Sequence, residues 1–214
     1  MFENREHAGE LLGVKIKLEL KNINPDVVVG ITRGGVVVGK EVAKTLRLPL
    51  DIIVIKKLGV PGNPELAIGA IGPGNSTYLD KRLLRMLRIT RDELMPIVVE
   101  KENARFDQEL LYRQGKKPFS VKGKIVILVD DGIATGATVL CAKKYFTSKM
   151  AKGVILAVPV ISEEVFRQLE GDFLAVIALR IEREFNAVGQ YYKEFRQVTD
   201  KEVVAILESN KVNK

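Results

Sequence analysis

Residues 124–138 read KIVILVDDGIATGAT, an apolar run that passes into two acids, a turn of small residues and a helical pattern. The run from Lys124 to Val129 is rich in β-branched residues, which predicts a strand buried on both faces. A helix is expected from about Thr135 to Met150. In open α/β sheets ligands bind at the carboxyl ends of the strands, so the turn between these two elements is a candidate binding site.

The same alternation recurs on both sides of this segment. Further strands are predicted at residues 26–31, 50–55, 153–160 and 172–179, and helices at residues 35–46 and 163–169. Alternating strands and helices are typical of a parallel sheet that is covered on both faces. The pattern therefore predicts an α/β fold with a Rossmann-like parallel sheet.

Two segments interrupt the alternation. Residues 58–75 are rich in glycine and proline, so we expect a flexible loop there, with a short strand around Leu66–Ile71. Residues 90–115 are expected to form an inserted helix, because Thr90 can cap it and Glu93 occupies the capping-box position. Pro96 falls late for a first-turn proline, so the helix is expected to kink or restart there.

The composition limits the possible chemistry. The chain has 214 residues, 46% hydrophobic and 29% charged, with one cysteine (Cys141) and one histidine (His7). These numbers exclude an internal disulfide and argue against a Cys/His zinc site. No membrane span or secretion signal is predicted, so we expect a cytoplasmic protein without a membrane partner. The net charge of +7 is dispersed among acids, so no nucleic-acid partner is expected either.

The turn after Val129 has two chemically different parts. Asp130 and Asp131 would repel a phosphate, but they suit the hydroxyls of a ribose diol or metal-bound water. The following residues suit a phosphate, because small side chains, hydroxyls and the amide groups of a helix start can surround it. The residues expected to bind the phosphate are Ala134, Thr135, Gly136, Ala137 and Thr138.

This turn resembles the motif by which type I phosphoribosyltransferases bind 5-phosphoribosyl-1-pyrophosphate (PRPP). The motif consists of apolar residues, two acids, a variable stretch, then Thr-Gly and a final Thr or Ser. The resemblance implies that a nitrogenous base displaces pyrophosphate from C1 of PRPP with inversion, through an oxocarbenium-like transition state. It also implies that Mg²⁺ binds mainly to PRPP oxygens, with Asp130 and Asp131 as candidate further ligands.

A second turn resembles the pyrophosphate loop of the same enzymes. It follows the predicted strand at residues 26–31 and consists of Thr32, Arg33, Gly34 and Gly35. Lys57 ends the next predicted strand, at the position where basic residues of these enzymes contact pyrophosphate. The resemblance implies that Arg33 and Lys57 stabilise the departing pyrophosphate, while Asp130 and Asp131 favour the developing positive charge. A plain βα turn and a solvated lysine pair are the alternative interpretations.

Residues 181–198, followed by a C-terminal helix, resemble the hood that covers the base in 6-oxopurine phosphoribosyltransferases. The resemblance implies Phe185, Val188 and Tyr191 as base-binding residues. The spacing to the glycine is one residue longer than in those enzymes, and simple aromatic packing is the alternative. In 6-oxopurine enzymes a catalytic acid precedes the Thr-Gly of the motif, and this chain has Ala134 at that position. Adenine and uracil enzymes resemble this chain in having alanine there. A 6-oxopurine acceptor is therefore disfavoured.

Over nearly its full length the chain resembles the branch of this superfamily called predicted phosphoribosyltransferases, for which no acceptor is established. Residues 1–214 are accordingly expected to form a single domain, and the superfamily implies a homodimer. Two other functions remain open. The first is a regulator on the same fold that senses PRPP or a nucleotide, and the second is a hydrolase or phosphorylase of sugar phosphates.

Overall fold

The computed structural model describes residues 1–210, and the side chains of residues 64 and 65 lie outside the description. In chain order the elements are α1 (Arg5–Glu19), β1 (Val27–Ile31), α2 (Gly34–Leu46), β2 (Leu50–Ile53), β3 (Lys56–Val60), β4 (Asn63–Ile71), β5 (Thr77–Leu79), α3 (Lys81–Met86), α4 (Arg91–Arg113), β6 (Ile125–Val129), α5 (Ala137–Ser148), β7 (Gly153–Ser162), α6 (Glu163–Leu169), β8 (Ala175–Glu182), the 3₁₀ turn η1 (Val188–Tyr191) and α7 (Asp200–Ser209).

The central sheet has five strands in the order β2-β1-β6-β7-β8. Every neighbouring pair in it is parallel. All five correspond to strands predicted from the sequence, with boundaries that differ by a few residues. The predicted parallel α/β fold is therefore confirmed.

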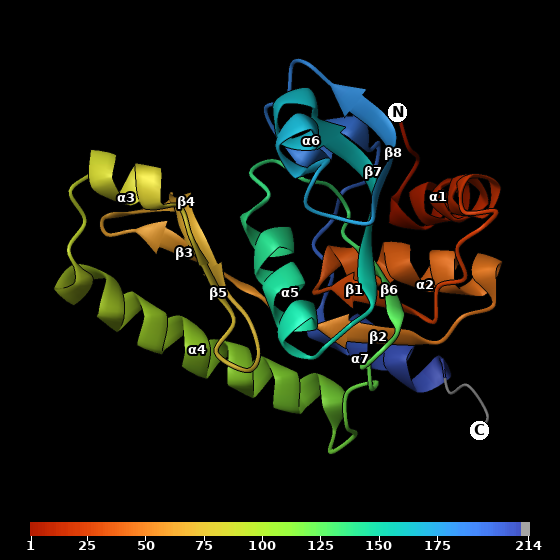
Figure 1. The fold of residues 1–214 in the computed structure, drawn as a ribbon, viewed down its shortest axis with the longest axis horizontal. Helices are drawn as coiled ribbons and strands as arrows, with labels where there is room; N and C mark the ends of the chain where they lie inside the picture. The colour runs from red at the N-terminus through yellow and green to blue at the C-terminus, as the bar shows by residue number, and fades with distance from the viewer. Residues whose placement is uncertain (211–214) are drawn as a thin grey trace.

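Helices cover both faces of this sheet (Figure 1). On one face α1 and α2 bury Leu12, Ile16 and Val38 against the strands. On the other face α5 and α6 bury side chains such as Val139 and Phe146. No element was predicted for residues 5–19, where α1 lies. This helix packs so closely on α2 that a Cβ atom at position 9, a glycine, would lie 2.7 Å from the Val38 carbonyl oxygen.

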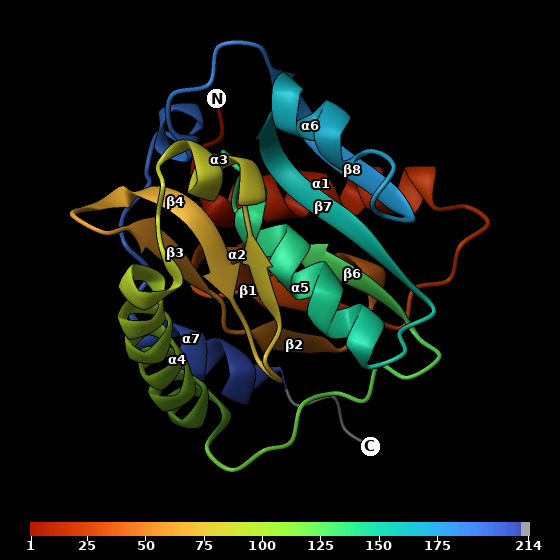
Figure 2. The same cartoon turned by 60° about the vertical axis from the view of Figure 1, so that its left-hand side comes forward.

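A second, antiparallel sheet of β3, β4 and β5 lies beyond α5, and α4 runs along its outer side (Figures 1 and 2). The short strand predicted around Leu66–Ile71 is confirmed as part of β4, but the flexible loop expected at residues 58–75 is wrong, because β3 and β4 form a hairpin there. The hairpin turns at Gly62, whose φ is +78°. Leu58, Ile68 and Leu94 are buried together, so α4 gives these strands an apolar surface that their own glycine-rich sequence does not reveal.

The helix predicted at residues 90–115 is confirmed as α4. Its capping box is complete: the Thr90 side chain accepts from the Glu93 amide, and the Glu93 carboxylate accepts from the Thr90 amide. Pro96 lies inside the helix, which continues to Arg113 without the expected restart. Loss of one backbone donor is tolerated here because the rest of the ladder remains.

The segment at residues 181–198, called the hood below, holds the N-terminus in place. The Phe2 amide donates to the Tyr191 carbonyl at 2.7 Å, and the Lys193 amide donates to the Phe2 carbonyl at 2.8 Å. Thr199 then caps the predicted C-terminal helix, α7. The start of α1 is consequently brought beside the carboxyl ends of the central strands.

Candidate functional site

A cleft of about 290 Å³ opens at the carboxyl ends of β1 and β6. It is lined by the turn after β1, the turn between β6 and α5, one residue of β3 and the hood. Because β1 and β6 are parallel neighbours, turns far apart in the sequence meet at one edge of the sheet. Of the residues proposed from the sequence, those lining it are Thr32, Arg33, Gly34, Lys57, Asp130, Asp131, Ala134, Thr135, Gly136, Thr138 and Val188.

The two turns touch through their smallest residues. A Cβ atom at Gly34 would lie 1.9 Å from Asp131 Oδ2, and one at Gly35 would lie 2.8 Å from Asp130 Cα. A side chain at either position would therefore collide with the acids. The glycines of the Arg33-Gly34-Gly35 turn are thus required for the acid pair and this turn to form one surface.

Asp131 is held by an arginine that the sequence analysis missed. Arg5 Nε donates to Asp131 Oδ2 at 2.7 Å, and Arg5 Nη1 donates to the Arg196 carbonyl at 2.8 Å. The guanidinium lies 3.8 Å from the centroid of the Phe195 ring, and only 8% of the residue is exposed. Because Nε, Nη1 and one face of the guanidinium are engaged, Arg5 fixes the position of one carboxylate oxygen of Asp131.

Asp130 is in a different electrostatic environment. The Asp131 amide donates to Asp130 Oδ1 at 2.9 Å. Burial, followed by the negative charge of Asp131, raises the pKa of Asp130 well above its ordinary value of 3.8. Simultaneous ionisation of the Asp130 and Asp131 carboxyl groups is therefore disfavoured.

The other side of the cleft is the start of α5. Gly136 occupies the N-cap position with φ +76°, and it has no side chain to bond the first amides of the helix. Thr135 is exposed and Thr138 is partly buried. Ala137 does not line the cleft and is buried in the core. These amides and hydroxyls form a surface suited to an anion.

Two cations border the cleft from other elements. Arg33 Nη1 lies 3.6 Å from Asp200 Oδ1, at the first residue of α7. Lys57 on β3 is exposed and lines the cleft. For the neighbouring Lys56, burial and the charge of Arg33 lower the pKa. The positive charge expected from the sequence is thus present around the cleft.

The hood reaches the cleft through different residues from those predicted. Val188 lines it and packs against Gly132, where a Cβ atom would lie 2.5 Å from Val188 Cγ1. Phe185 and Tyr191 are outside the lining; their rings pack on each other at 5.3 Å between centroids. The aromatic ring that does line the cleft is Phe195. The structure therefore brings Val188, but not Phe185 and Tyr191, to the site.

Tyr192 is a further residue that the sequence analysis did not assign. Its hydroxyl donates to the Asp131 carbonyl at 2.6 Å, and burial raises the pKa of the phenol, which keeps it a neutral donor. Tyr192 and Phe195 lie in the predicted hood, residues 181–198, but were not among the residues predicted to bind the base. Arg5 carries no such signal, because its contact to Asp131 joins positions 126 residues apart.

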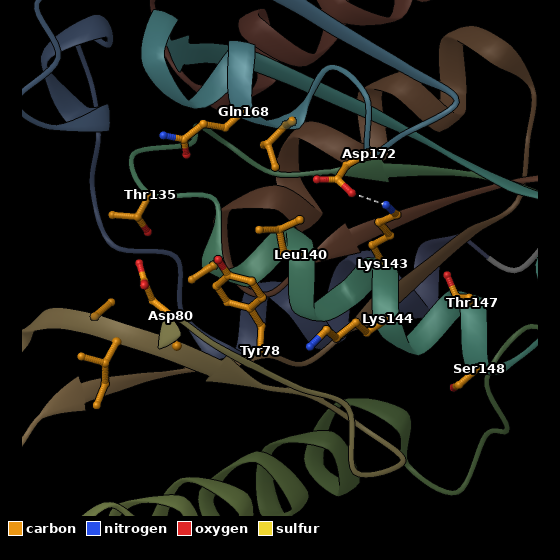
Figure 3. Close-up of a pocket in the computed structure, with 15 residues that line it drawn as sticks. Tyr78, Asp80, Thr135, Leu140, Lys143, Lys144, Thr147, Ser148, Gln168 and Asp172 are labelled. Atoms are coloured by element: carbon orange, nitrogen blue, oxygen red, sulfur yellow. Dashed lines mark hydrogen bonds and ion pairs between the residues drawn. The ribbon is translucent and has the colours of Figure 1, made fainter. Parts of the chain in front are cut away.

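A larger groove of about 690 Å³ lies between α5, α6 and the small sheet (Figure 3). It shares only Thr135 with the cleft. Several of its charged groups already have structural partners. Lys143 Nζ lies 2.6 Å from Asp172 Oδ1, and Asp80 accepts from the first amides of α3. The cleft, with its adjacent acids and helix start, is therefore the better candidate for chemistry.

Within residues 1–210, no group of three or more His, Cys, Asp and Glu side chains is placed to hold a metal ion. Asp131 Oδ2 is also occupied by Arg5. Over the same residues, no helix has the length and apolar character needed to cross a membrane.

Comparison with known sequences adds independent information. The profile of the phosphoribosyl transferase domain family matches residues 4–191. Two strains of Mycobacterium tuberculosis have a protein, provisionally named a phosphoribosyl transferase, that is 38% identical over 217 residues. The match covers 97% of this chain but 46% of each relative, so the chain spans about half the length of these relatives.

Solved structures show the same fold. The protein TT1426 from Thermus thermophilus is 38% identical, with a TM-score of 0.80 over 97% of this chain and 98% of its own. A Neisseria gonorrhoeae protein, solved with bound ppGpp, has a TM-score of 0.50 at 12% identity and covers 99% of both chains. The second likeness concerns the fold alone.

Proposed function

Because the chain belongs to the phosphoribosyl transferase family, we propose that it transfers the 5-phosphoribosyl group of PRPP to a nitrogenous base and releases pyrophosphate. The observation that carries this proposal is the cleft, where Asp130 and Asp131 lie between a helix start and an arginine-bearing glycine turn. Residues 1–214 would act as one phosphoribosyltransferase domain. The absence of a membrane-spanning helix in residues 1–210 is compatible with action in the cytoplasm.

The charged and polar groups of the cleft suggest where each part of PRPP would bind. The 5′-phosphate would bind the amides and hydroxyls between Ala134 and Thr138. The ribose hydroxyls would donate to Asp130 and Asp131. The pyrophosphate would lie against the turn from Thr32 to Gly35, with Lys57 on its outer side.

In the reaction the bond from C1 to the pyrophosphate oxygen breaks, and a ring nitrogen of the base bonds to C1 from the opposite face. The proton of the ring nitrogen passes to water or to a pyrophosphate oxygen, and pyrophosphate leaves with the electrons of the broken bond. Asp131, held in place by Arg5, would stabilise the positive charge that develops on the ribose. Arg33 and Lys57 would stabilise the negative charge on the leaving pyrophosphate.

Mg²⁺ is the expected cofactor, and the residues present fit an ion that arrives bound to PRPP. Within residues 1–210 no cage of protein ligands is formed, so the chain would contribute Asp130 and Asp131 at most. When bound, the ion would neutralise charge on the pyrophosphate oxygens.

The cleft also bears on the acceptor. Ala134 is exposed and lines the cleft, so the position before Thr135-Gly136 has no carboxylate that could contact the base. A 6-oxopurine would lack the acid that accepts its N7 proton in the enzymes specific for hypoxanthine and guanine. Val188 and Phe195 would contact the flat face of another base.

The test is pyrophosphate release from PRPP and Mg²⁺ across a panel of bases that includes adenine, uracil, hypoxanthine and guanine. We expect release that depends on one base other than hypoxanthine or guanine. Tight PRPP binding without release for any base in an extended panel would contradict the transferase and support a sensing regulator. Release without any base would support a hydrolase.

A further inference from the structure

Of the five large apolar side chains of α4 that are exposed to solvent, four lie on one side of the helix. Met95, Val99, Phe106 and Leu110 have 41%, 53%, 53% and 56% of their surface exposed. With 3.6 residues per turn, positions 95, 99, 106 and 110 fall within about 60° around the helix axis, so they form one stripe. This set is called the α4 stripe below.

The α4 stripe is separate from the side chains that α4 buries within its own chain. The buried residues of α4 are Leu94, Arg105 and Tyr112. They lie about 100° or more from the middle of the stripe on the helical wheel. Both views place α4 at the periphery of the molecule (Figures 1 and 2). A row of exposed large apolar side chains on such a helix is characteristic of an interaction surface.

The spacing of the stripe indicates what covers it. Positions 95 and 110, and positions 99 and 106, are placed symmetrically about the midpoint between Glu102 and Asn103. A two-fold axis through that midpoint would set Met95 against Leu110 of a second copy, and Val99 against its Phe106. In a two-fold interface the same surface meets itself, so the contact must be self-complementary. The α4 stripe has this property.

We propose that α4 packs antiparallel against α4 of a second copy of this chain, with the α4 stripe as the apolar centre of a two-fold dimer. This inference goes beyond the proposed reaction and does not depend on it. A shorter exposed row on α1 (Leu11, Val14 and Leu18) is the competing surface. The α4 stripe is about 22 Å long and the α1 row about 10 Å, so α4 can bury the larger apolar strip.

Two neighbouring residues provide a matched pair of variants. Leu110 belongs to the stripe, whereas Leu111 is 49% exposed and lies about 100° further around the same helix. In analytical ultracentrifugation over a range of protein concentrations, we expect a wild-type dimer. Leu110→Asp should weaken the dimer by about tenfold or more, and Leu111→Asp should leave it unchanged. Val99→Asp repeats the test, and circular dichroism checks that each variant is folded.

The orientation of the helices has its own test. Cys141 is buried and is the chain's only cysteine, so Asn103→Cys supplies one accessible thiol beside the expected axis. A short bismaleimide should link two copies through position 103. A wild-type monomer at all concentrations would overturn the proposal. So would a dimer that survives both stripe variants, one that dissociates instead with Leu18→Asp, or one that is not linked through position 103.

Discussion

Asp130 and Asp131 are adjacent in the sequence, but their surroundings give them different properties. Asp131 is bonded to Arg5, and its carbonyl accepts from Tyr192. Asp130 has a raised pKa because of burial and the charge of its neighbour. The pair motif was recognisable from the sequence, whereas its support by Arg5 was not, since that contact forms only when α1 packs on α2, β7 and β8.

The raised pKa of Asp130 has a consequence for stability. A carboxyl group whose pKa is raised by folding favours the folded state while it is protonated, and this contribution is lost as the pH rises above 3.8 through the folded-state pKa. Asp130→Asn removes the ionisation and keeps an oxygen that can accept from the Asp131 amide. The variant should therefore gain stability relative to the wild type as the pH rises from about 4 to about 8. Urea unfolding at several pH values would show this, and a constant difference between the proteins would contradict it.

Arg5 is expected to act through Asp131 as a positioning residue. Arg5→Met removes both the charge and the hydrogen bonds, so PRPP affinity should fall by about tenfold or more. Arg5→Lys keeps the charge without the fork of donors, so it should recover part of the affinity. Titration calorimetry with PRPP and Mg²⁺ measures both variants. Equal affinity for the wild type and Arg5→Met, with both folded, would exclude this role.

The turn after β1 and the turn after β6 fit closely against each other in the cleft. Gly34 and Gly35 begin α2, and their lack of side chains lets the acids that follow β6 approach. The Arg33-Gly34-Gly35 turn was found in the sequence by its resemblance to a pyrophosphate loop. That its glycines make room for Asp130 and Asp131 could not be inferred, because it depends on the spacing between two strands.

Gly34→Ala tests this match. The new Cβ atom would lie 1.9 Å from Asp131 Oδ2, so the acid must move, at a cost of about 1–3 kcal/mol. PRPP affinity should fall about tenfold or more as a result. The matched control is Gly171→Ala, because a Cβ atom at Gly171 meets nothing within 4 Å. Calorimetric titration that shows unchanged binding to Gly34→Ala would contradict the assignment of this turn.

The small sheet shows where local patterns fail. Residues 58–75 have the glycine and proline content of a loop, yet β3 and β4 form because Leu58 and Ile68 find a buried surface against Leu94. That surface is supplied by α4, which follows later in the chain. In the central sheet, by contrast, each strand carries its own apolar run. The five parallel strands were therefore predictable one at a time, whereas of the hairpin only the strand within β4 was predicted and its partner β3 was not.

The molecule as a whole consists of five layers (Figure 1). The first is formed by α1 and α2, the second by the central sheet and the third by α5 and α6. The small sheet is the fourth layer, and α4 is the fifth. The cleft lies at the end of the central layer, and the α4 stripe lies on the outermost one. The Mycobacterium tuberculosis relatives are about twice as long as this chain. This chain matches less than half of each relative, so the activity proposed here is that of the matching part.

The central claim is that the cleft at Asp130 to Thr138 binds PRPP, and calorimetric titration of PRPP with Mg²⁺ tests it most directly. One PRPP should bind per chain, and Asp131→Asn should weaken binding by about tenfold or more, because a charged acceptor for the ribose hydroxyls is lost. Asp172→Asn is the matched control, since Asp172 is an acid of the neighbouring groove, paired with Lys143. It should leave the affinity unchanged. Failure of the wild type to bind PRPP, or equal affinity for the wild type and Asp131→Asn, would contradict the account.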